Sequence, residues 1–546
     1  MKKITLLILL LTITNVYSQS QNFIGKSYES AVENGILKSR VITNPQINTG
    51  SNVFVNVNNP PFSFSPLDSR VRWQFTDPYA IANDVAISGE GLTDVCGWQL
   101  NSKRVSVYDT NSNIPLWEYT TSSNVYRNYV SISDSTGYIA VGTQLNFLIF
   151  TRGSNTPIFN FDLTTIPDTG IAGPVALTFS GNFLVACVQR NDTSTVMGFN
   201  RTSNIPVWKY RMATAIQGVK IGGSDSLLIV NTYYGYAVLN TFTGAKRYAA
   251  SITGGTQTQQ AISGNGDYIA TINYNGYVYC YHWTGSAYSL VLSFQEPPGT
   301  YYNWMSTVDI SNDGQYLATG SLIFVTSSSY DGRVRFFKIS DGNTPKWTYA
   351  GFGDEVTTVA FARNSKILVA SSWGALDNHT DDLVFFKAPI FTNVPVYTVH
   401  TPGSLYAAGV SDDGRSVITG GKLVHARNFG YGGTLFNVYI DTSINPTGIK
   451  NISNILPDNY QLKQNYPNPF NPTTKIEFDI PKSGLVSLKV YDVSGKEVAT
   501  LVNQTLSMGK YEVDFSADNY QLSSGVYFYK MTTPNFSKVL KMILIK

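Results

Sequence analysis

The stretch Val308-Asp309-Ile310-Ser311-Asn312-Asp313-Gly314-Gln315-Tyr316-Leu317-Ala318-Thr319-Gly320 decides the fold of this chain. Two short apolar segments flank Asn312-Asp313-Gly314, a turn sequence that readily supplies the positive-φ positions of a tight hairpin. A third segment, Val334–Lys338, and a proline–aromatic segment, Pro345-Lys346-Trp347, follow. Because proline is tolerated at the start of an edge strand, the last segment belongs at the outside. The stretch therefore predicts a small four-stranded antiparallel sheet.

The first segment of this sheet recurs eight times along the chain. The copies begin at Val85, Val130, Val175, Val219, Gln260, Val308, Val359 and Ala408. A period of about 46 residues with four strands per unit is typical of a β-propeller. We therefore predict an all-β fold with an eight-bladed β-propeller over residues 70–440. Seven blades remain the alternative, because the repeat around residue 220 is irregular.

The last repeat lacks a fourth segment. It ends its third segment near Ile440, whereas the lone segment Arg70-Val71-Arg72-Trp73-Gln74-Phe75 stands before the first repeat and matches the fourth type. We predict that this N-terminal segment completes the last blade and closes the ring. Closure removes the open edges that a linear array of sheets would expose.

Composition excludes several classes of protein. Aromatic residues make up 13% and charged residues 14% of the chain, which argues against global disorder and against a coiled coil. The 39 basic and 36 acidic residues give a net charge of +3, too small an excess for a nucleic-acid-binding surface. Cys96, Cys187 and Cys280 lie in separate apolar segments and are interpreted as small buried residues, not as disulfide or zinc partners.

The N-terminus has the pattern of a signal peptide. Two lysines precede the apolar segment Ile4–Ile13, and Val16-Tyr17-Ser18 ends in small residues suited to cleavage. A membrane anchor is the alternative, but ten apolar residues span only about 15 Å as a helix. We expect residues 1–18 to be a signal peptide, residues 19–69 to be an irregular extension, and the mature chain to have no transmembrane segment.

A second domain is expected after residue 440. Residues 441–458 are rich in Asn, Ser, Pro and Gly and are interpreted as a linker. Short alternating segments follow, which predict a small Ig-like β-sandwich over residues 459–546. These segments are Lys475–Ile480, Val486–Tyr491, Tyr511–Phe515, Gly525–Met531 and Lys538–Ile545.

This C-terminal region also carries a family resemblance. It contains, in order, Tyr466-Pro467-Asn468-Pro469-Phe470, Val490-Tyr491-Asp492, Gly495, Gly525, Tyr527, Lys538 and Lys541. Residues 459–546 resemble the type A sorting domain of the type IX secretion system. The resemblance implies export to the periplasm of a Gram-negative bacterium, passage through its outer membrane, and release or attachment at the cell surface. It also implies the secretion machinery and a sortase-like peptidase as partners. An ordinary Ig-like module that stays on the protein is the alternative.

The propeller repeats resemble quinoprotein-like and WD40-like propellers. The Gly-His and Trp-Asp dipeptides of WD40 repeats are absent, and the quinoprotein repeat pattern survives only in degraded form at Asn240-Thr241-Phe242-Thr243-Gly244. The adjacent cysteine pair of many quinone-dependent dehydrogenases is also absent. The resemblance therefore predicts the fold and assigns no cofactor residue.

The sequence contains no recognisable catalytic motif. Its four histidines, at 282, 379, 400 and 425, form no His-x-x-x-His pair, and neither a Gly-x-Ser-x-Gly nor a His-Glu-x-x-His pattern occurs. Asp354 and Glu355 are interpreted as solvated loop charges, because neighbouring side chains on a strand point to opposite faces. We therefore predict no catalytic residue and no resident organic cofactor.

We expect the working surface to be one face of the propeller, built by the connections into the first strands and by the hairpins between second and third strands. Asp377, Asp381 and Asp382 lie in such a hairpin and could hold Ca²⁺, although a plain solvated turn is the alternative. Exposed aromatic rings and arginines on this face could recognise sugars or peptides. The alternative is that the same residues pack between blades. The candidates are Tyr126, Arg127, Tyr301, Tyr302, Trp304, His425, Arg427 and Tyr431.

Together these observations predict a secreted or surface-attached binding protein with a glycan or protein ligand. The alternative is a propeller lyase, glycosidase or quinone-type oxidoreductase with its site in the central channel. A third possibility is that the propeller only spaces or stabilises a surface assembly. Converging carboxylates or histidines in the channel would favour an enzyme.

Overall fold

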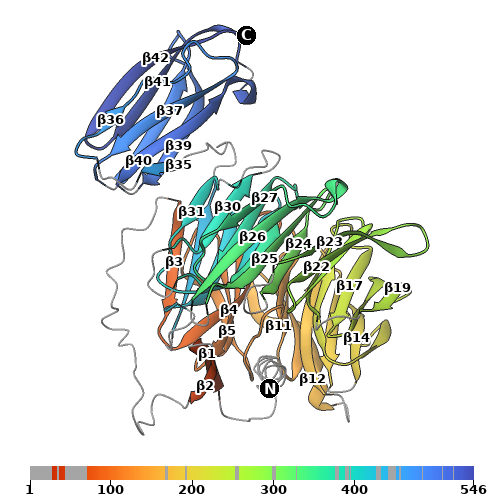
Figure 1. Cartoon of the computed structure of the whole chain (residues 1–546). Helices are drawn as coiled ribbons and strands as arrows, with labels where there is room; N and C mark the ends of the chain where they lie inside the picture. The colour runs from red at the N-terminus through yellow and green to blue at the C-terminus, as the bar shows by residue number, and fades with distance from the viewer. Residues whose placement is uncertain are drawn as a thin grey trace. The chain divides into compact units, whose positions relative to one another are not determined.

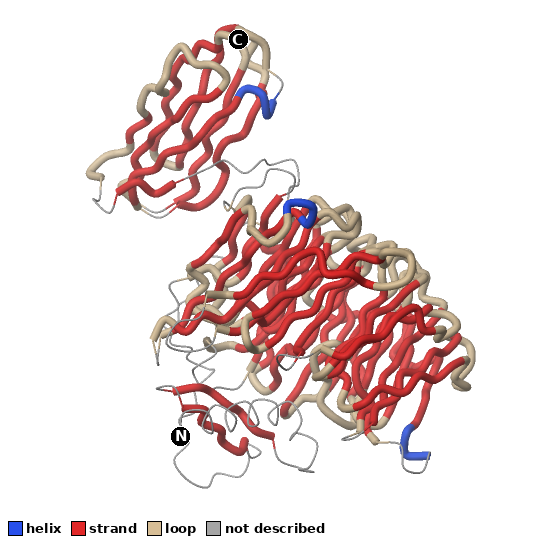
Figure 2. Tube along the Cα trace, turned by 45° about the vertical axis from the view of Figure 1, so that its right-hand side comes forward, coloured by secondary structure: helices blue, strands red, loops and turns tan. Residues whose placement is uncertain are grey.

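A computed structural model describes residues 70–165, 170–190, 193–252, 257–297, 303–326, 329–375, 380–387, 393, 395–425, 432–440, 457–482, 484–506, 508–520 and 522–546, together with the backbone of strands at 27–33, 36–42 and 450–453. The chain divides into two compact units; the first contains Met1–Val384 and Thr398–Ile440, and the second contains Asp441–Lys546 together with the short segment Phe385–Tyr397. No helix within these ranges is long and apolar enough to cross a membrane. Almost all regular structure is β-strand (Figure 2).

The first unit is built from four-stranded antiparallel sheets that follow one another along the chain (Figure 1). Eight such sheets lie within the described part of residues 71–439. The innermost strands are β4 (Ala80–Ile87), β8 (Val130–Ile132), β12 (Ile171–Leu177), β16 (Ile216–Ile221), β20 (Gln257–Ile262), β24 (Trp304–Ile310), β28 (Val356–Phe361) and β32 (Leu405–Val410). The second strands are β5 (Thr93–Leu100), β9 (Tyr138–Gly142), β13 (Phe183–Gln189), β17 (Leu227–Thr232), β21 (Tyr268–Asn273), β25 (Tyr316–Phe324), β29 (Ile367–Ser372) and β33 (Ser416–Lys422).

The two outer positions of each sheet follow the same order. The third strands are β6 (Arg104–Asp109), β10 (Asn146–Thr151), β14 (Thr193–Asn200), β18 (Gly235–Asn240), β22 (Tyr277–Trp283), β26 (Tyr330–Lys338), β30 (Leu383–Lys387) and β34 (Gly433–Tyr439). The outermost strands are β7 (Pro115–Thr120), β11 (Ser154–Asp162), β15 (Trp208–Ala213), β19 (Lys246–Ser251), β23 (Tyr288–Gln295), β27 (Trp347–Ala350), β31 (Tyr397–Val399) and β3 (Val71–Asp77). The irregular repeat around residue 220 is thus a complete sheet, β16 to β19.

The innermost strands close into a ring. Each of them contacts the innermost strand of the next sheet, and β32 of the last sheet contacts β4 of the first. Closed contact of this kind between successive four-stranded sheets is the arrangement of a β-propeller. Buried side chains of neighbouring sheets interlock between the blades, as where Phe161 of the second sheet packs on Phe199 of the third with ring centroids 4.9 Å apart.

The N-terminal strand β3 closes this ring, which confirms the prediction made from residues 70–75. It pairs antiparallel with β34, with Trp73 opposite Asn437 and Phe75 opposite Leu435. The indole Nε1 of Trp73 donates to the Thr110 carbonyl of the first sheet at 2.9 Å. The last sheet therefore combines strands from both ends of the propeller sequence.

The same tryptophan contact recurs inside the chain. Trp117 of β7 donates to the carbonyl of Arg152 at 2.8 Å, and Trp208 of β15 donates to the carbonyl of Thr241 at 3.0 Å. In each case the accepting carbonyl follows the third strand of the next sheet. Each indole is at least 91% buried, so an outer-strand tryptophan anchors its blade to the next one.

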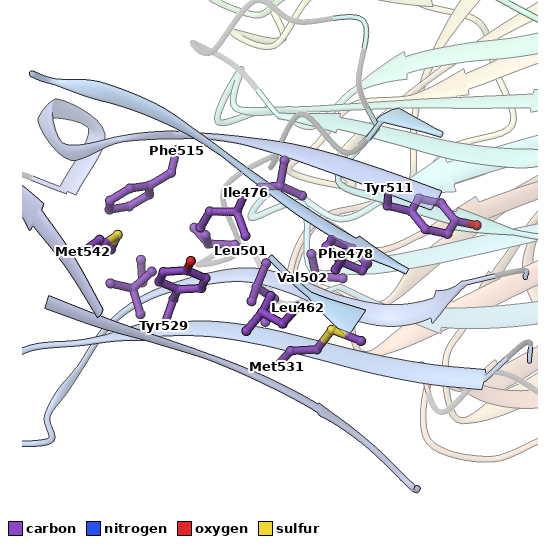
Figure 3. Close-up of a cluster of buried hydrophobic side chains, with 14 of the residues drawn as sticks. Leu462, Ile476, Phe478, Leu501, Val502, Tyr511, Phe515, Tyr529, Met531 and Met542 are labelled. Atoms are coloured by element: carbon purple, nitrogen blue, oxygen red, sulfur yellow. The ribbon is translucent and has the colours of Figure 1, made fainter. Parts of the chain in front are cut away.

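The second unit contains two four-stranded antiparallel sheets around one core (Figure 3). One sheet has the order β35 (Lys450–Ser453), β40 (Gly509–Ser516), β37 (Thr473–Ile480), β36 (Gln461–Leu462). The other has the order β39 (Glu497–Leu506), β38 (Gly484–Tyr491), β41 (Gly525–Thr533), β42 (Phe536–Leu544). Alternate residues of both sheets fill the core, among them Ile476, Phe478, Tyr529 and Met531.

Short elements complete the described structure. The strands β1 (Ser27–Glu33) and β2 (Ile36–Ile42) pair antiparallel within the segment that we expected to be irregular. Three short 3₁₀ helices occur at η2 (Leu163–Thr165), η3 (Ile339–Asp341) and η4 (Ala517–Tyr520).

Candidate functional site

Charged side chains from the innermost strands and their flanking turns reach across the centre of the ring. Arg127, directly before β8, donates from its guanidinium to the carbonyl of Thr357 in β28, although the second and seventh sheets are not neighbours. The ammonium of Lys220 in β16 pairs with the carboxylate of Asp309 in β24. These contacts occupy the channel with protein side chains and tie together sheets that are not neighbours in the ring.

A third cross-ring pair lies at the other end of the innermost strands. Arg363, after β28, donates from Nη2 to Oδ1 of Asp134 at 2.9 Å, and its Nε lies 3.5 Å from Oδ1 of Asp412. The same guanidinium stacks 3.5 Å above the ring centroid of Phe179. Burial raises the pKa of both carboxyl groups, and the charge of Arg363 opposes that rise.

Gly89 allows this cluster to form. A Cβ atom at residue 89 would lie only 2.7 Å from Oδ1 of Asp134 and 2.7 Å from Oδ2 of Asp412. Because nonbonded carbon and oxygen atoms do not approach so closely, a larger residue would push the two carboxylates away from Arg363. The glycine therefore serves close approach at the centre of the ring.

Asp84 is a buried carboxylate of β4 with a strongly perturbed acidity. Its Oδ2 accepts hydrogen bonds from the backbone amides of Tyr129 at 2.8 Å and Val130 at 2.9 Å. Burial raises the pKa of Asp84 to about 7, while these amides and the charge of Arg127 lower it. The carboxyl group thus bridges the first and second sheets and would exchange a proton near neutral pH.

The expected calcium site is only partly within the described residues. Asp377 lies outside them, Asp381 is partly exposed, and Asp382 is fully buried. Asp382 accepts hydrogen bonds at Oδ2 from the amide and the hydroxyl of Thr401, at 3.0 and 2.8 Å. Among the residues that the structure describes, no three His, Cys, Asp or Glu side chains form a group that could hold a metal ion.

The predicted ligand face is brought together only in part. Tyr126, Arg127 and Trp304 are half-buried at the expected end of the blades, whereas Tyr301, Tyr302, Arg427 and Tyr431 lie outside the described residues. The expectation that His425 is presented to solvent is wrong, because His425 is only 3% exposed and its Nδ1 lies 3.2 Å from the Trp373 carbonyl oxygen.

A further correction concerns Asp354. We expected Asp354 and Glu355 to be solvated loop charges, but Asp354 is 2% exposed and its Oδ1 accepts the amide of Glu355 at 2.7 Å. The loop before β28 turns the carboxyl group inward, which an alternating strand pattern does not reveal. Glu355 itself is half-buried.

Several aromatic residues of this face were missed by the sequence analysis. Tyr274 follows β21, Phe324 ends β25 and Tyr330 begins β26, and all three are half-buried. With Trp304 they form a chain of edge-to-face contacts: Tyr274–Trp304 at 5.4 Å, Trp304–Phe324 at 5.3 Å and Phe324–Tyr330 at 5.5 Å between ring centroids. These three residues lie at the connections between the second and third strands of their sheets, and this position in the sequence could have identified them. We call these four residues the aromatic rim.

In the second unit, the first and last predicted motifs lie against each other. Asn468 accepts the amide of Ile543 at its Oδ1, at 2.9 Å, and the buried Phe470 donates its amide to the Ile543 carbonyl, also at 2.9 Å. The Nζ of Lys538 donates to the carbonyl of Leu462 at 3.0 Å. The segment around Tyr466–Phe470 is thus hydrogen-bonded to the final strand, β42.

The other residues of the predicted sorting motif serve turns, the core or the surface. Gly495 has φ 82° in the turn before β39, and Tyr527 is buried with its hydroxyl donating to the Ser523 carbonyl at 2.8 Å. Tyr466 is 80% exposed, and Gly525 and Lys541 are also exposed. The peptide bonds before Pro467 and Pro469 are cis.

Comparisons with known proteins bear on both units. Residues 464–546 match the family model of the secretion system C-terminal sorting domain, and residues 295–338 match that of the WD domain, G-beta repeat. No curated protein matches the chain. The β-propeller domain of Cps50 (Swd1) from Myceliophteria thermophila is a similar solved structure, with 11% identity and a TM-score of 0.42 over 55% of this chain and 95% of that chain.

The second match falls on a single blade. It covers the whole of β24, β25 and β26, which include the stretch from Val308 to Gly320. The fold follows from the sheet order and the closed ring of inner strands, and the repeat match agrees with it. Residues 464–546 are therefore a type IX secretion C-terminal sorting domain, and the chain that carries it is an exported, WD40-like β-propeller protein.

Proposed function

We propose that this protein works outside a Gram-negative cell as a binding protein whose ligand, a glycan or another protein, docks on the propeller. In this proposal residues 1–18 are a signal peptide, residues 19–69 precede an eight-bladed propeller over 70–440, and a linker over 441–458 joins it to the Ig-like sorting domain. The secretion machinery recognises that domain at the outer membrane, and a sortase-like peptidase removes it.

The observation that carries the binding role is that charged side chains within the ring are already bound to protein groups. Arg127, Lys220 and Arg363 each contact a partner on a distant blade. A catalytic group must reach the substrate and change its protonation or bonding there. Cations that a carbonyl or a carboxylate binds across the channel are held by the fold, so the channel is a weak candidate for a catalytic site.

One observation favours the enzyme alternative. The pKa of Asp84 is raised to about 7, which suits a general acid or base, and Arg127 lies close enough to act on its charge. However, both bonds to Oδ2 come from backbone amides of the adjacent blade. Such bonds are also what a purely structural clamp between two blades requires.

The test compares binding and turnover in the same sample. The purified mature chain, residues 19–546, is applied to a glycan and peptide array, and the same chain is incubated with glycosidase, lyase and quinone-oxidoreductase substrates. The binding role predicts reproducible array binding that persists in Asp84→Asn. Turnover that disappears in Asp84→Asn while the variant keeps its thermal stability would establish the enzyme instead. Absence of both binding and turnover would leave the spacer role as the better description.

A further inference from the structure

The aromatic rim is distinguished from the rest of the propeller by its lack of charge. Its segments at residues 273–276, 303–305 and 323–330 contain aromatic, amide, hydroxyl and aliphatic residues, and no Asp, Glu, Lys, Arg or His. Two acidic side chains adjoin these segments: Asp331 accepts the amide of Gly351 at 3.0 Å and lies 3.7 Å from Nε of Arg333, and the buried Glu296, beside Gly276, binds Arg335 through both oxygens. Among the described residues, the charges next to the rim are therefore already engaged by partners.

The buried side chain of Asn303 also holds part of the rim in place. Asn303, which is 6% exposed, accepts the amide of Phe324 at 2.9 Å and donates from Nδ2 to the carbonyl of Pro297 at 2.7 Å. These bonds tie the start of β24 to the end of β25, so Trp304 and Phe324 keep a constant separation. Fixed rings lose little conformational entropy when a ligand binds.

Neutral polar residues lie next to the rings along the chain. Thr326 and Ser329 are exposed at the tip of the β25–β26 hairpin. Asn273, directly before Tyr274, is buried and accepts the amides of Asn275 and Tyr277 at Oδ1, whereas its Nδ2 has no acceptor among the described residues. Rings fixed among amides and hydroxyls match a molecule with apolar faces and many neutral hydroxyl groups.

We propose that the aromatic rim, Tyr274, Trp304, Phe324 and Tyr330, binds a neutral carbohydrate. The proposal rests on the binding role above and names the class of its ligand. The carbon-rich face of a pyranose ring packs on an aromatic ring, and the surrounding amides and hydroxyls exchange hydrogen bonds with the sugar. A charged polysaccharide or an ionic peptide would meet no opposite charge within the rim segments.

The test is calorimetric titration of the full mature chain with neutral hexasaccharides of cello-, xylo-, manno- and laminari-type, with hexagalacturonate as the charged comparison. We expect at least one neutral hexasaccharide to bind. Trp304→Ala and Tyr274→Ala should each weaken that binding by about tenfold or more, while Trp304→Phe should keep a larger part of it. The matched control is Trp373→Ala. Trp373 is also half-buried, but its ring contacts Tyr406, with 5.8 Å between the centroids, and is not part of the rim. The affinity of this variant for the hexasaccharide should stay within about twofold of wild type.

Each contrary outcome points to a different failure. If no neutral hexasaccharide binds while a peptide on the array does, the carbohydrate assignment is wrong and the binding role stands. If neither class binds, both are wrong. If a hexasaccharide binds equally well to wild type, Tyr274→Ala and Trp304→Ala, the sugar site lies elsewhere and the rim assignment is wrong. Thermal melting of each variant shows whether it is folded. If Trp304→Ala does not fold, the affinity of Tyr274→Ala alone tests the rim assignment.

Discussion

Replacing Trp73 by alanine tests whether the N-terminal strand holds the propeller closed. The Trp73 side chain is 6% exposed, lies 5.3 Å from the ring of Tyr108, and donates one hydrogen bond to Thr110 in the first sheet. Truncating a buried tryptophan costs about 3–5 kcal/mol, and the lost hydrogen bond adds roughly 1 kcal/mol. We therefore expect Trp73→Ala to lower the free energy of unfolding by about 4–6 kcal/mol. Trp73→Phe keeps most of the packing and should cost roughly 1–2 kcal/mol.

Tryptophan fluorescence during guanidinium unfolding is the appropriate assay. All eight tryptophans lie between residues 73 and 373, so the signal comes from the propeller and not from the sorting domain. A dependence of the unfolding free energy of about 5 kcal/mol per M denaturant, reasonable for a domain of this size, converts the expected loss into a midpoint lower by roughly 0.8–1.2 M.

Trp208→Ala is the matched control. Trp208 has the same outer-strand position and the same kind of indole-to-carbonyl bond, but its strand is continuous with the rest of its sheet along the chain. Both variants should lose similar stability if β3 is a full member of the last blade. A midpoint for Trp73→Ala that equals wild type, beside a clear loss in Trp208→Ala, would refute the view that β3 closes the ring.

Three further predictions follow from other parts of the molecule. Deleting residues 459–546 should leave the protein in the periplasm, because the sorting domain is lost; normal amounts of truncated protein in the medium, measured by immunoblot of cell fractions, would contradict this. Glu296→Gln should destabilise the propeller by about 3–5 kcal/mol, because it leaves the mostly buried Arg335 without its counter-charge. In the wild type, Arg335 binds both carboxylate oxygens of Glu296, at 2.7 and 2.6 Å. Equal urea midpoints for variant and wild type would argue against this prediction. Burial raises the pKa of Asp94 to about 8, above its unfolded value, so folding favours the protonated form and stability falls as pH rises from about 4 to 8. Asp94→Asn should therefore reduce the loss of stability between pH 5 and pH 8 by roughly 3 kcal/mol, and an unchanged pH profile of the unfolding midpoint would show that Asp94 is not the group responsible.

The candidate site was less predictable than the fold. Tyr126, Arg127 and Trp304 could be assigned to one end of the blades from their position before the innermost strands. The role of Arg127 could not, because its partner Thr357 is 230 residues away and lies on a blade that is not a neighbour. The burial of His425 depends on how the seventh and eighth sheets pack, since its ring lies against the Trp373 carbonyl. The spacing of residues along one strand contains no information about either contact.

The sequence alone determined what is local: strands that alternate with turns, a repeat of about 46 residues, an unpaired fourth strand at the N-terminus, and a sorting domain recognised by its motifs. Hydrogen bonds within one small antiparallel sheet join residues close in the chain, so residue pattern and turn chemistry are sufficient to specify them. Only the tertiary structure decided which side chains meet across the ring, such as Arg363 with Asp134, and which aromatic residues gather on the rim. Ring closure brings these residues together from different blades, and their contacts depend on the packing of neighbouring sheets, which no single repeat encodes.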